Sequence, residues 1–145
     1  MLSLNDVSNL TDIAFPTLTD WAKRGVIRPL AVRGRSRKFD RIGVLVASVT
    51  KALRKQGLSL DTIEPVAKYI GELSEGDIIS AVSGGTPFLL FDGDRPRFVA
   101  TASDVSRRST AATVLIFVNI AEALHRVDNA MECHRTYKRA LAMTA

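Results

Sequence analysis

Four helix-breaking residues lie close together near the start of this chain and restrict it there to short elements. Pro16, Gly25, Pro29 and Gly34 follow one another within fewer than twenty residues. Proline fits the first turn of a helix, and glycine fits the position just after its end. The residue before a proline disfavours the helical conformation. We therefore predict a helix over about residues 16–24, followed by an extended exit through 26–29.

An apolar pattern of three-residue spacing predicts another short helix just before this one. Its members are Leu4, Val7, Leu10 and Ile13, and they place the helix near 5–11 with Asn5 as its cap. Two short helices separated by a tight turn form the skeleton of a helix-turn-helix. Within the second of these helices, we assign Trp21 to packing against the helix that follows.

The next segment, residues 31–39, predicts a small hairpin with a basic tip. It has apolar residues at both ends and Gly34 near its middle. Across 21–41 there are eight basic residues against the single acid Asp40. Residues 1–73 carry 12 Lys/Arg and 7 Asp/Glu, whereas 74–145 carry 8 of each, so the net charge of +5 lies in the first half. A positive field concentrated in this way suits a polyanion.

Two more helical patterns occupy the middle of the chain. Asp40 can cap a helix whose apolar stripe runs from Ile42 to Leu53 and which Gly57 ends. The stretch Asp61-Thr62-Ile63-Glu64 resembles a capping box and predicts the start of a fourth helix. We expect the cations on the polar face of the third helix to be solvated; they are Lys51, Arg54 and Lys55.

Several of these segments occur together in one order. The stretch from Leu18 through Gly25 to Pro29 is followed by the basic hairpin and then by Gly57-Leu58-Ser59-Leu60-Asp61-Thr62-Ile63. Over about residues 2–73 this order resembles the MerR family of winged helix-turn-helix regulators. The three pieces are similar to the family's recognition helix with its exit to proline, its wing, and the turn between its third and fourth helices. The resemblance implies DNA binding, with distortion between half-sites as the means of controlling a promoter.

Two sets of residues are candidates for contact with double-stranded DNA. A recognition helix presents its polar side to base edges in the major groove, and here that side carries Thr17, Thr19, Asp20, Lys23 and Arg24. Arginines of a wing grip phosphates or enter a narrow minor groove, and the hairpin carries Arg33, Arg35, Arg37 and Lys38. For each set, an ordinary solvated surface is the alternative interpretation.

From about Ser74 the pattern changes to short mixed elements. It predicts a helix over 75–82, strands over 88–91 and 97–100, a helical turn over 104–108, a strand over 113–118 that is buried on both faces, and a last helix capped by Asn119. The expected fold class is α+β. A winged helix-turn-helix domain would occupy residues 1–73, and a small mixed α/β module with a C-terminal helix would occupy 74–145.

The last predicted helix has an apolar stripe near a 3.5-residue spacing, which is typical of helices that pair. The stripe contains Ile120, Leu124, Val127, Met131 and Leu141. We therefore expect a homodimer, which would place two recognition helices about one helical turn apart on a palindromic site. The residues leave open whether the C-terminal module also receives a protein partner or a small-molecule effector.

Few residues suggest chemistry. Cys133 is the only cysteine, which excludes an internal disulfide and a multi-cysteine zinc site. No phosphate-binding loop or catalytic arrangement is recognisable, so we expect no enzyme, no cofactor and no metal. No apolar run is long enough to span a membrane, and the first residues lack the regions of a secretion signal. The expected location is the cytoplasm, at the nucleoid of a bacterium or in a phage-encoded system.

Three hypotheses of function follow. The first is a sequence-specific transcription regulator that acts as a homodimer. The second is a mobile-element protein of the excisionase or architectural kind, because such proteins carry similar winged domains. The third is a protein-interaction adaptor that does not bind DNA. Asp20 keeps the third hypothesis open, as does Thr19, which stands where the family usually has an arginine.

Overall fold

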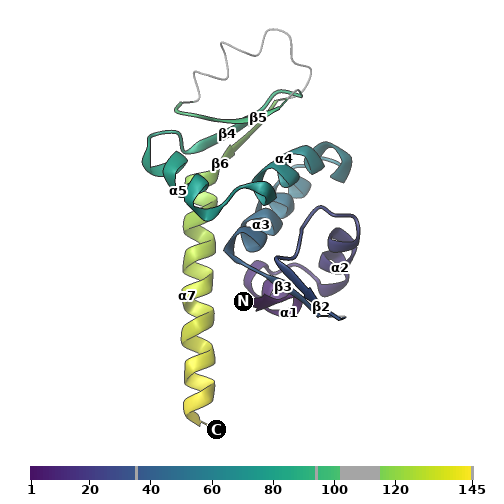
Figure 1. Ribbon diagram of the computed structural model, residues 1–145, viewed down its shortest axis with the longest axis vertical. Coiled ribbons are helices and arrows are strands. Elements are labelled where there is room, and N and C mark those ends of the chain that lie inside the picture. The colour runs from purple at the N-terminus through teal and green to yellow at the C-terminus, as the bar shows by residue number, and fades with distance from the viewer. Residues whose placement is uncertain (35, 94, 102–114, 145) are drawn as a thin grey trace.

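The protein is an α+β fold in which a long C-terminal helix runs alongside the other elements (Figure 1). The structure, a computed structural model, describes residues 1–34, 36–93, 95–101 and 115–144. The fold class and the N-terminal helix-turn-helix predicted from the sequence are confirmed. None of the helices in these ranges is both long enough and apolar enough to cross a membrane.

The N-terminal elements are two short helices and a small antiparallel sheet. They are β1 (Leu2–Ser3), α1 (Leu4–Thr11), α2 (Phe15–Lys23), β2 (Ala31–Arg33) and β3 (Ser36–Phe39), with the strands in the order β1-β3-β2. The hairpin of β2 and β3 confirms the predicted wing. Strand β1 was not predicted, because two residues are too few to show a periodicity.

The cap of α1 differs from the expected one. Ser3 rather than Asn5 begins the helix, since the Asp6 amide donates to Ser3 Oγ at 3.1 Å. In return the Ser3 amide donates to the Asp6 carboxylate at 2.9 Å, which completes a reciprocal capping box. The same serine ends β1, so the chain passes from strand to helix without a loop.

Three helices follow: α3 (Arg41–Lys55), α4 (Leu60–Glu72) and α5 (Glu75–Ser83). Asp40 caps α3 as predicted, because its carboxylate accepts from the Gly43 amide at 3.0 Å. The predicted cap of α4 is wrong by two residues. Ser59 Oγ accepts from the Thr62 amide at 3.3 Å, so the helix begins before Asp61. Helices α4 and α5 meet directly at residues 73 and 74, where the two predicted domains join.

A second antiparallel sheet contains β4 (Phe88–Phe91), β5 (Pro96–Val99) and β6 (Ile116–Asn119) in the order β5-β4-β6. The strands predicted over 88–91 and 97–100 are confirmed as β4 and β5, and they pair as an antiparallel hairpin. The prediction that the last strand is buried on both faces is wrong. Ile116 is buried but Phe117 is 38% exposed, because β6 lies at a sheet edge and turns one face to the core. Residues 113 and 114 and the helical turn predicted over 104–108 lie outside the described ranges.

Helix α7 (Ile120–Thr144) joins the two halves of the chain. Asn119 caps it as predicted, since its side-chain oxygen accepts from the Glu122 amide at 3.0 Å. Ile120, Leu124 and Val127 are buried in one hydrophobic cluster that also contains residues of α1 to α4 and of the second sheet. These three positions of the predicted dimer stripe therefore stabilise the fold of a single chain.

The other two residues of the predicted stripe are less buried. Met131 is partly buried against the same cluster, whereas Leu141 is 51% exposed. The last turns of α7 extend beyond the other elements (Figure 1). The exposed part of the predicted stripe is thus confined to the distal end of the helix.

Candidate nucleic-acid interface

Helix α2 is held by its apolar side and presents its polar side outward. Leu18 and Trp21 are buried in the core, at 0% and 5% exposure. The predicted contact residues on the opposite side are open: Thr17, Asp20, Lys23 and Arg24 are exposed, and Thr19 is half-buried. Gly25 follows the helix with φ at +76°, a left-handed conformation that glycine adopts without strain.

Local contacts modify three of these side chains. Thr19 Oγ1 donates to the Phe15 carbonyl at 2.9 Å, so its hydroxyl is engaged with its own helix. Arg24 Nε lies 3.9 Å from Asp20 Oδ2, one turn along the exposed face. The positive charge of Arg24 therefore offsets the repulsion that Asp20 would exert on a phosphate.

The wing carries its cations on both faces. Val32 is opposite Arg37 in the β2–β3 ladder, and Ala31 is opposite Lys38. Because side chains alternate along a strand, Arg33 and Lys38 share one face and Arg37 lies on the other. Phe39, on the same face as Arg37, is fully buried and anchors the wing to the core. Arg35, the fourth predicted wing cation, lies outside the described ranges.

The recognition helix and the wing lie on one side of the molecule. Figure 1 shows α2 and the β2–β3 hairpin on the side away from α7. The predicted cations of the helix and the wing that have no ion-pair partner among the described residues are Lys23, Arg33, Arg37 and Lys38. The two elements that carry the sequence-predicted sites, α2 and the hairpin, thus lie on the same side of the molecule.

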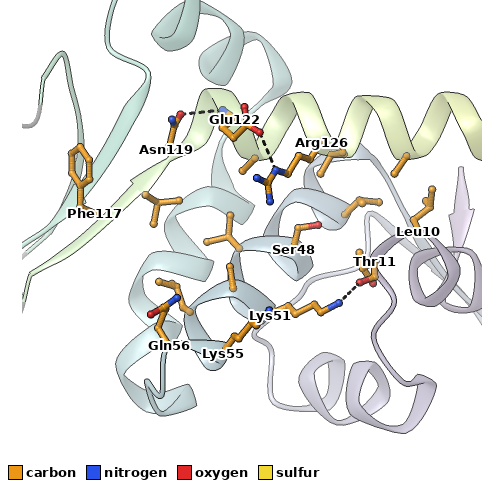
Figure 2. Close-up of a pocket in the computed structure, with 18 residues that line it drawn as sticks. Leu10, Thr11, Ser48, Lys51, Lys55, Gln56, Phe117, Asn119, Glu122 and Arg126 are labelled. Atoms are coloured by element: carbon orange, nitrogen blue, oxygen red, sulfur yellow. Dashed lines mark hydrogen bonds and ion pairs between the residues drawn. The ribbon is translucent and has the colours of Figure 1, made fainter.

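Two cations of α3 are exposed, as expected of a solvated face, and also donate to backbone carbonyls. Lys51 Nζ donates to the Thr11 carbonyl at 2.9 Å and to the Asp12 carbonyl at 3.3 Å (Figure 2). Arg54 donates to the Leu58 carbonyl at 2.9 Å. Both side chains are exposed, yet they satisfy backbone oxygens where α1 and α3 end.

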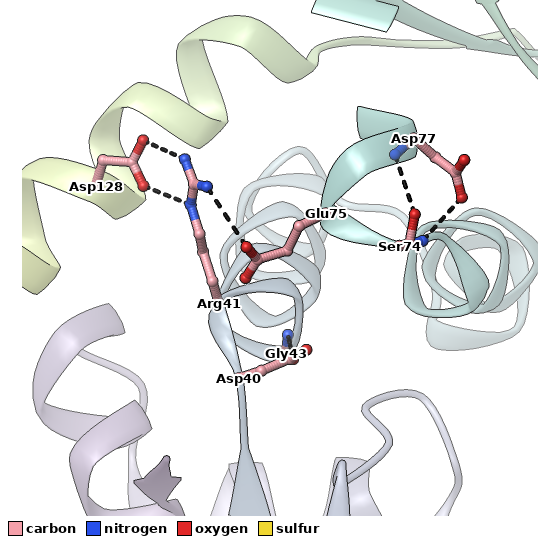
Figure 3. A network of polar contacts seen from close by, with 7 residues as sticks. All are labelled: Asp40, Arg41, Gly43, Ser74, Glu75, Asp77 and Asp128. Carbon is pink, nitrogen blue, oxygen red and sulfur yellow. Dashed lines mark hydrogen bonds and ion pairs between the residues drawn. The ribbon is translucent and has the colours of Figure 1, made fainter. Parts of the chain in front are cut away.

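Two of the eight basic residues in 21–41 form ion pairs with carboxylates, and the sequence pattern did not predict these pairs. Arg41 donates to both carboxylate oxygens of Asp128, at 2.7 and 2.6 Å, and lies 3.9 Å from Glu75 (Figure 3). The hydrogen bonds that Arg41 donates to Asp128 raise the pKa of Arg41, although partial burial works against this. Arg28 lies 3.6 Å from Glu72. Arg41 therefore ties α3 to α5 and α7 and is turned from the recognition surface.

A second polar contact holds α7 against α1. Lys138 Nζ donates to Asp6 at 3.0 Å, and His134 Nε2 lies 3.4 Å from the same carboxylate oxygen. Burial opposes ionisation of Asp6, but hydrogen bonds from Ser3 and Lys138 outweigh it and lower the pKa of Asp6 to about 2. His134 therefore faces α1 rather than its neighbour Cys133, which is exposed.

A family model described as MerR HTH family regulatory protein matches residues 2–70. Residues 2–70 form a MerR-like helix-turn-helix domain. The MerR-like domain spans β1 to α3 and most of α4, so it includes both candidate surfaces. Helices α5 and α7 and the second sheet lie outside the match. No curated protein matches the chain.

Proposed function

We propose that this chain is a sequence-specific, double-stranded-DNA-binding transcription regulator that acts as a homodimer. The observation that supports this most is the MerR-like domain with its cations on the helix and the wing: Lys23 on α2 and Arg33 on the wing are exposed, and Arg37 and Lys38 on the wing are half-buried. Cations without a protein partner attract phosphates and release the counterions that DNA holds. The buried anchors Trp21 and Phe39 keep the helix and the wing fixed relative to the core.

The polar side of α2 supplies the base contacts in this proposal. An aspartate accepts from the cytosine amine, and an arginine donates to guanine in the major groove. Asp20 and Arg24 are one turn apart and exposed, so they can meet neighbouring base pairs. Thr17 and Lys23 flank them on the same side. Wing residues would then hold the phosphates and set the register of the helix.

The distal end of α7 supplies the dimer contact. Tyr137 and Leu141 are one helical turn apart, at 63% and 51% exposure, and Met143 is 88% exposed. Large apolar side chains gathered on a projecting helix end are typical of a surface that another chain covers. Two copies paired there would present two recognition helices to a palindromic site.

The test of DNA binding is retention of genomic fragments by the purified protein at about 50 and 200 mM salt, against random duplex competitor. Retention of a few sequences at the higher salt supports a specific regulator. A long cooperative footprint on the ends of one element would instead indicate an excisionase-like protein. Equal retention of all sequences at low salt, lost at high salt, would favour the adaptor, and a stoichiometric protein partner would establish it.

The contribution of the wing is measured by the salt dependence of binding. The double variant Arg33→Ala with Arg37→Ala should flatten the slope of log K against log salt by about 0.9 per lost phosphate contact. The matched control is Arg95→Ala with Arg126→Ala, two exposed arginines outside the MerR-like domain. A slope equal to the wild type in the wing variant would remove the wing from the interface.

A further inference from the structure

A groove of about 550 Å³ lies where α3, the first turns of α7 and β6 meet. Its lining is largely apolar, with Val49 and Leu53 from α3, Val118 from β6, and Ala123 and Val127 from α7 (Figure 2). The volume falls within the range of small-molecule sites, which combine an apolar lining with a few polar groups. The groove is therefore large enough for a small ligand with an apolar body.

The polar groups around the groove are mainly cationic. Lys51, Lys55 and Arg126 line it, against the single carboxylate of Glu122. Arg126 Nε donates to Glu122 at 2.9 Å, and Lys51 reaches the carbonyls at the end of α1. Lys55 has no ion-pair partner among the described residues. The rim thus carries an excess of positive charge that an anion would neutralise.

The positive charge of the groove rim decides between two candidate occupants of the groove, a second copy of the chain and a small anion. The exposed end of α7 from a second copy is the obvious apolar competitor for the groove. That end carries Arg135, Lys138 and Arg139 against Glu132, so it has the same sign as the groove. This end therefore gains no charge complementarity from the groove, whereas a small anion does.

We propose that the groove binds a small amphipathic carboxylate, with its hydrocarbon body against the apolar lining and its carboxylate at the cationic rim, to which α3 contributes Lys55 and α7 contributes Arg126. The ligand would contact α3, which follows the wing directly, and α7, which carries the distal apolar end. Ligand binding would therefore favour one orientation of the recognition helix and wing relative to the distal end of α7. This regulatory consequence rests on the proposed function, whereas the binding itself does not.

The test uses octanoate and its neutral analogue 1-octanol in titration calorimetry with the full chain. We expect saturable binding of octanoate at one site per chain and weaker binding of 1-octanol. The variant Lys55→Gln with Arg126→Gln should weaken octanoate about tenfold, or about threefold for each exposed cation, and leave 1-octanol unchanged. The matched control, Lys68→Gln with Arg95→Gln, removes two charges outside the groove and should change neither ligand.

Blocking the groove gives the second measurement. Ala52 is exposed on α3 and lines the groove, so Ala52→Trp fills it without entering the core. This variant should abolish binding of both ligands while keeping the wild-type unfolding midpoint. Amide chemical-shift changes in the wild type, which should cluster on α3, β6 and the start of α7, locate the ligand independently of any variant. Shift changes clustered elsewhere, no saturable binding of octanoate at millimolar concentration, or full binding by a folded Ala52→Trp protein would overturn the proposal.

The outcomes separate the groove from the DNA-binding proposal. Octanoate binding without specific DNA retention keeps the groove and removes the regulator. DNA retention without octanoate binding removes only the groove. Where both bind, octanoate should change the DNA affinity of the wild type and leave that of Ala52→Trp unchanged; equal DNA affinity with and without octanoate in the wild type would refute the coupling.

Discussion

The same substitution at two positions of α7 separates packing within one chain from pairing between chains. Leu124 is 8% exposed and lies in the hydrophobic cluster, whereas Leu141 is 51% exposed near the end of the helix. Leu124→Ala and Leu141→Ala remove the same atoms from one helix. Their effects should nevertheless appear in different measurements, because the first leucine is covered by its own chain and the second by the proposed partner.

The expected magnitudes follow from burial. Leucine-to-alanine changes in a core cost about 2–5 kcal/mol, so Leu124→Ala should lower the free energy of unfolding by about 3 kcal/mol. Leu141→Ala should change the stability of one chain by less than about 0.5 kcal/mol. In a symmetric dimer it removes two leucines from the interface. At about 1.5 kcal/mol each, the dissociation constant should rise by about a hundredfold.

Urea unfolding and sedimentation are the two measurements. Trp21 is the only tryptophan and is 5% exposed, so its fluorescence reports unfolding. Leu124→Ala should lower the unfolding midpoint by a similar amount at about 1 and 50 µM protein. Leu141→Ala should shift the sedimenting mass toward the monomer. A mass unchanged by Leu141→Ala, or a Leu124→Ala effect seen only in the mass, would refute this division of α7.

The remaining predictions concern single contacts. A double-mutant cycle of Arg41→Ala and Asp128→Ala should give a coupling energy of about 1 kcal/mol, since Asp128 is 42% exposed; additivity would show that the pair does not hold α3 to α7. Because the pKa of Asp6 is lowered to about 2, its stabilisation is present above pH 4 and is lost as the pH falls toward 2; Asp6→Asn should remove roughly 2 kcal/mol of this acid-dependent stability in urea titrations. Ser59→Ala should cost about 1 kcal/mol of helix capping, whereas a larger loss from Asp61→Ala would restore Asp61 as the cap.

The sequence predicted those elements whose signals are local. Gly25 ends α2 and Asp40 caps α3 through contacts within one helical turn, so both helix boundaries could be predicted from the sequence alone. Asn119 did the same for α7. The MerR-like order of these signals extended the prediction from single elements to the N-terminal domain, and the family match over residues 2–70 confirms it.

Where several residues competed for one role, the local signal was insufficient. Asn5 and Ser3 can both cap a helix, as can Asp61 and Ser59, and in each pair the structure uses the earlier residue. The earlier start brings one more apolar residue, Leu4 or Leu60, onto the helix, where it packs against the core. Burial of that residue depends on elements distant in the sequence, so propensity alone could not decide between the two caps.

Contacts across the chain left no pattern to predict from. Arg41 and Asp128 are 87 residues apart, and each belongs to a different regular helix. By sequence, Arg41 is one of eight cations in a cluster that suits DNA. In the fold, its guanidinium instead donates to Asp128 and so links α3 to α7. The candidate interface therefore has fewer free cations than the charge count of the cluster suggests.

The apolar stripe of α7 shows why periodicity alone cannot distinguish an internal partner from an external one. A helix packed on its own core and a helix paired with a second copy both require apolar residues near a 3.5-residue spacing. Length separates the two. The 25 residues of α7 span about 37 Å and the 15 residues of α3 about 22 Å, so α7 exceeds α3 by about 15 Å. Ile120, Leu124 and Val127 lie within the shared length and are buried, whereas Leu141 lies in the excess and is exposed. In the proposed dimer another chain would cover that excess, and this is why the dimer prediction now depends on the last turns of α7.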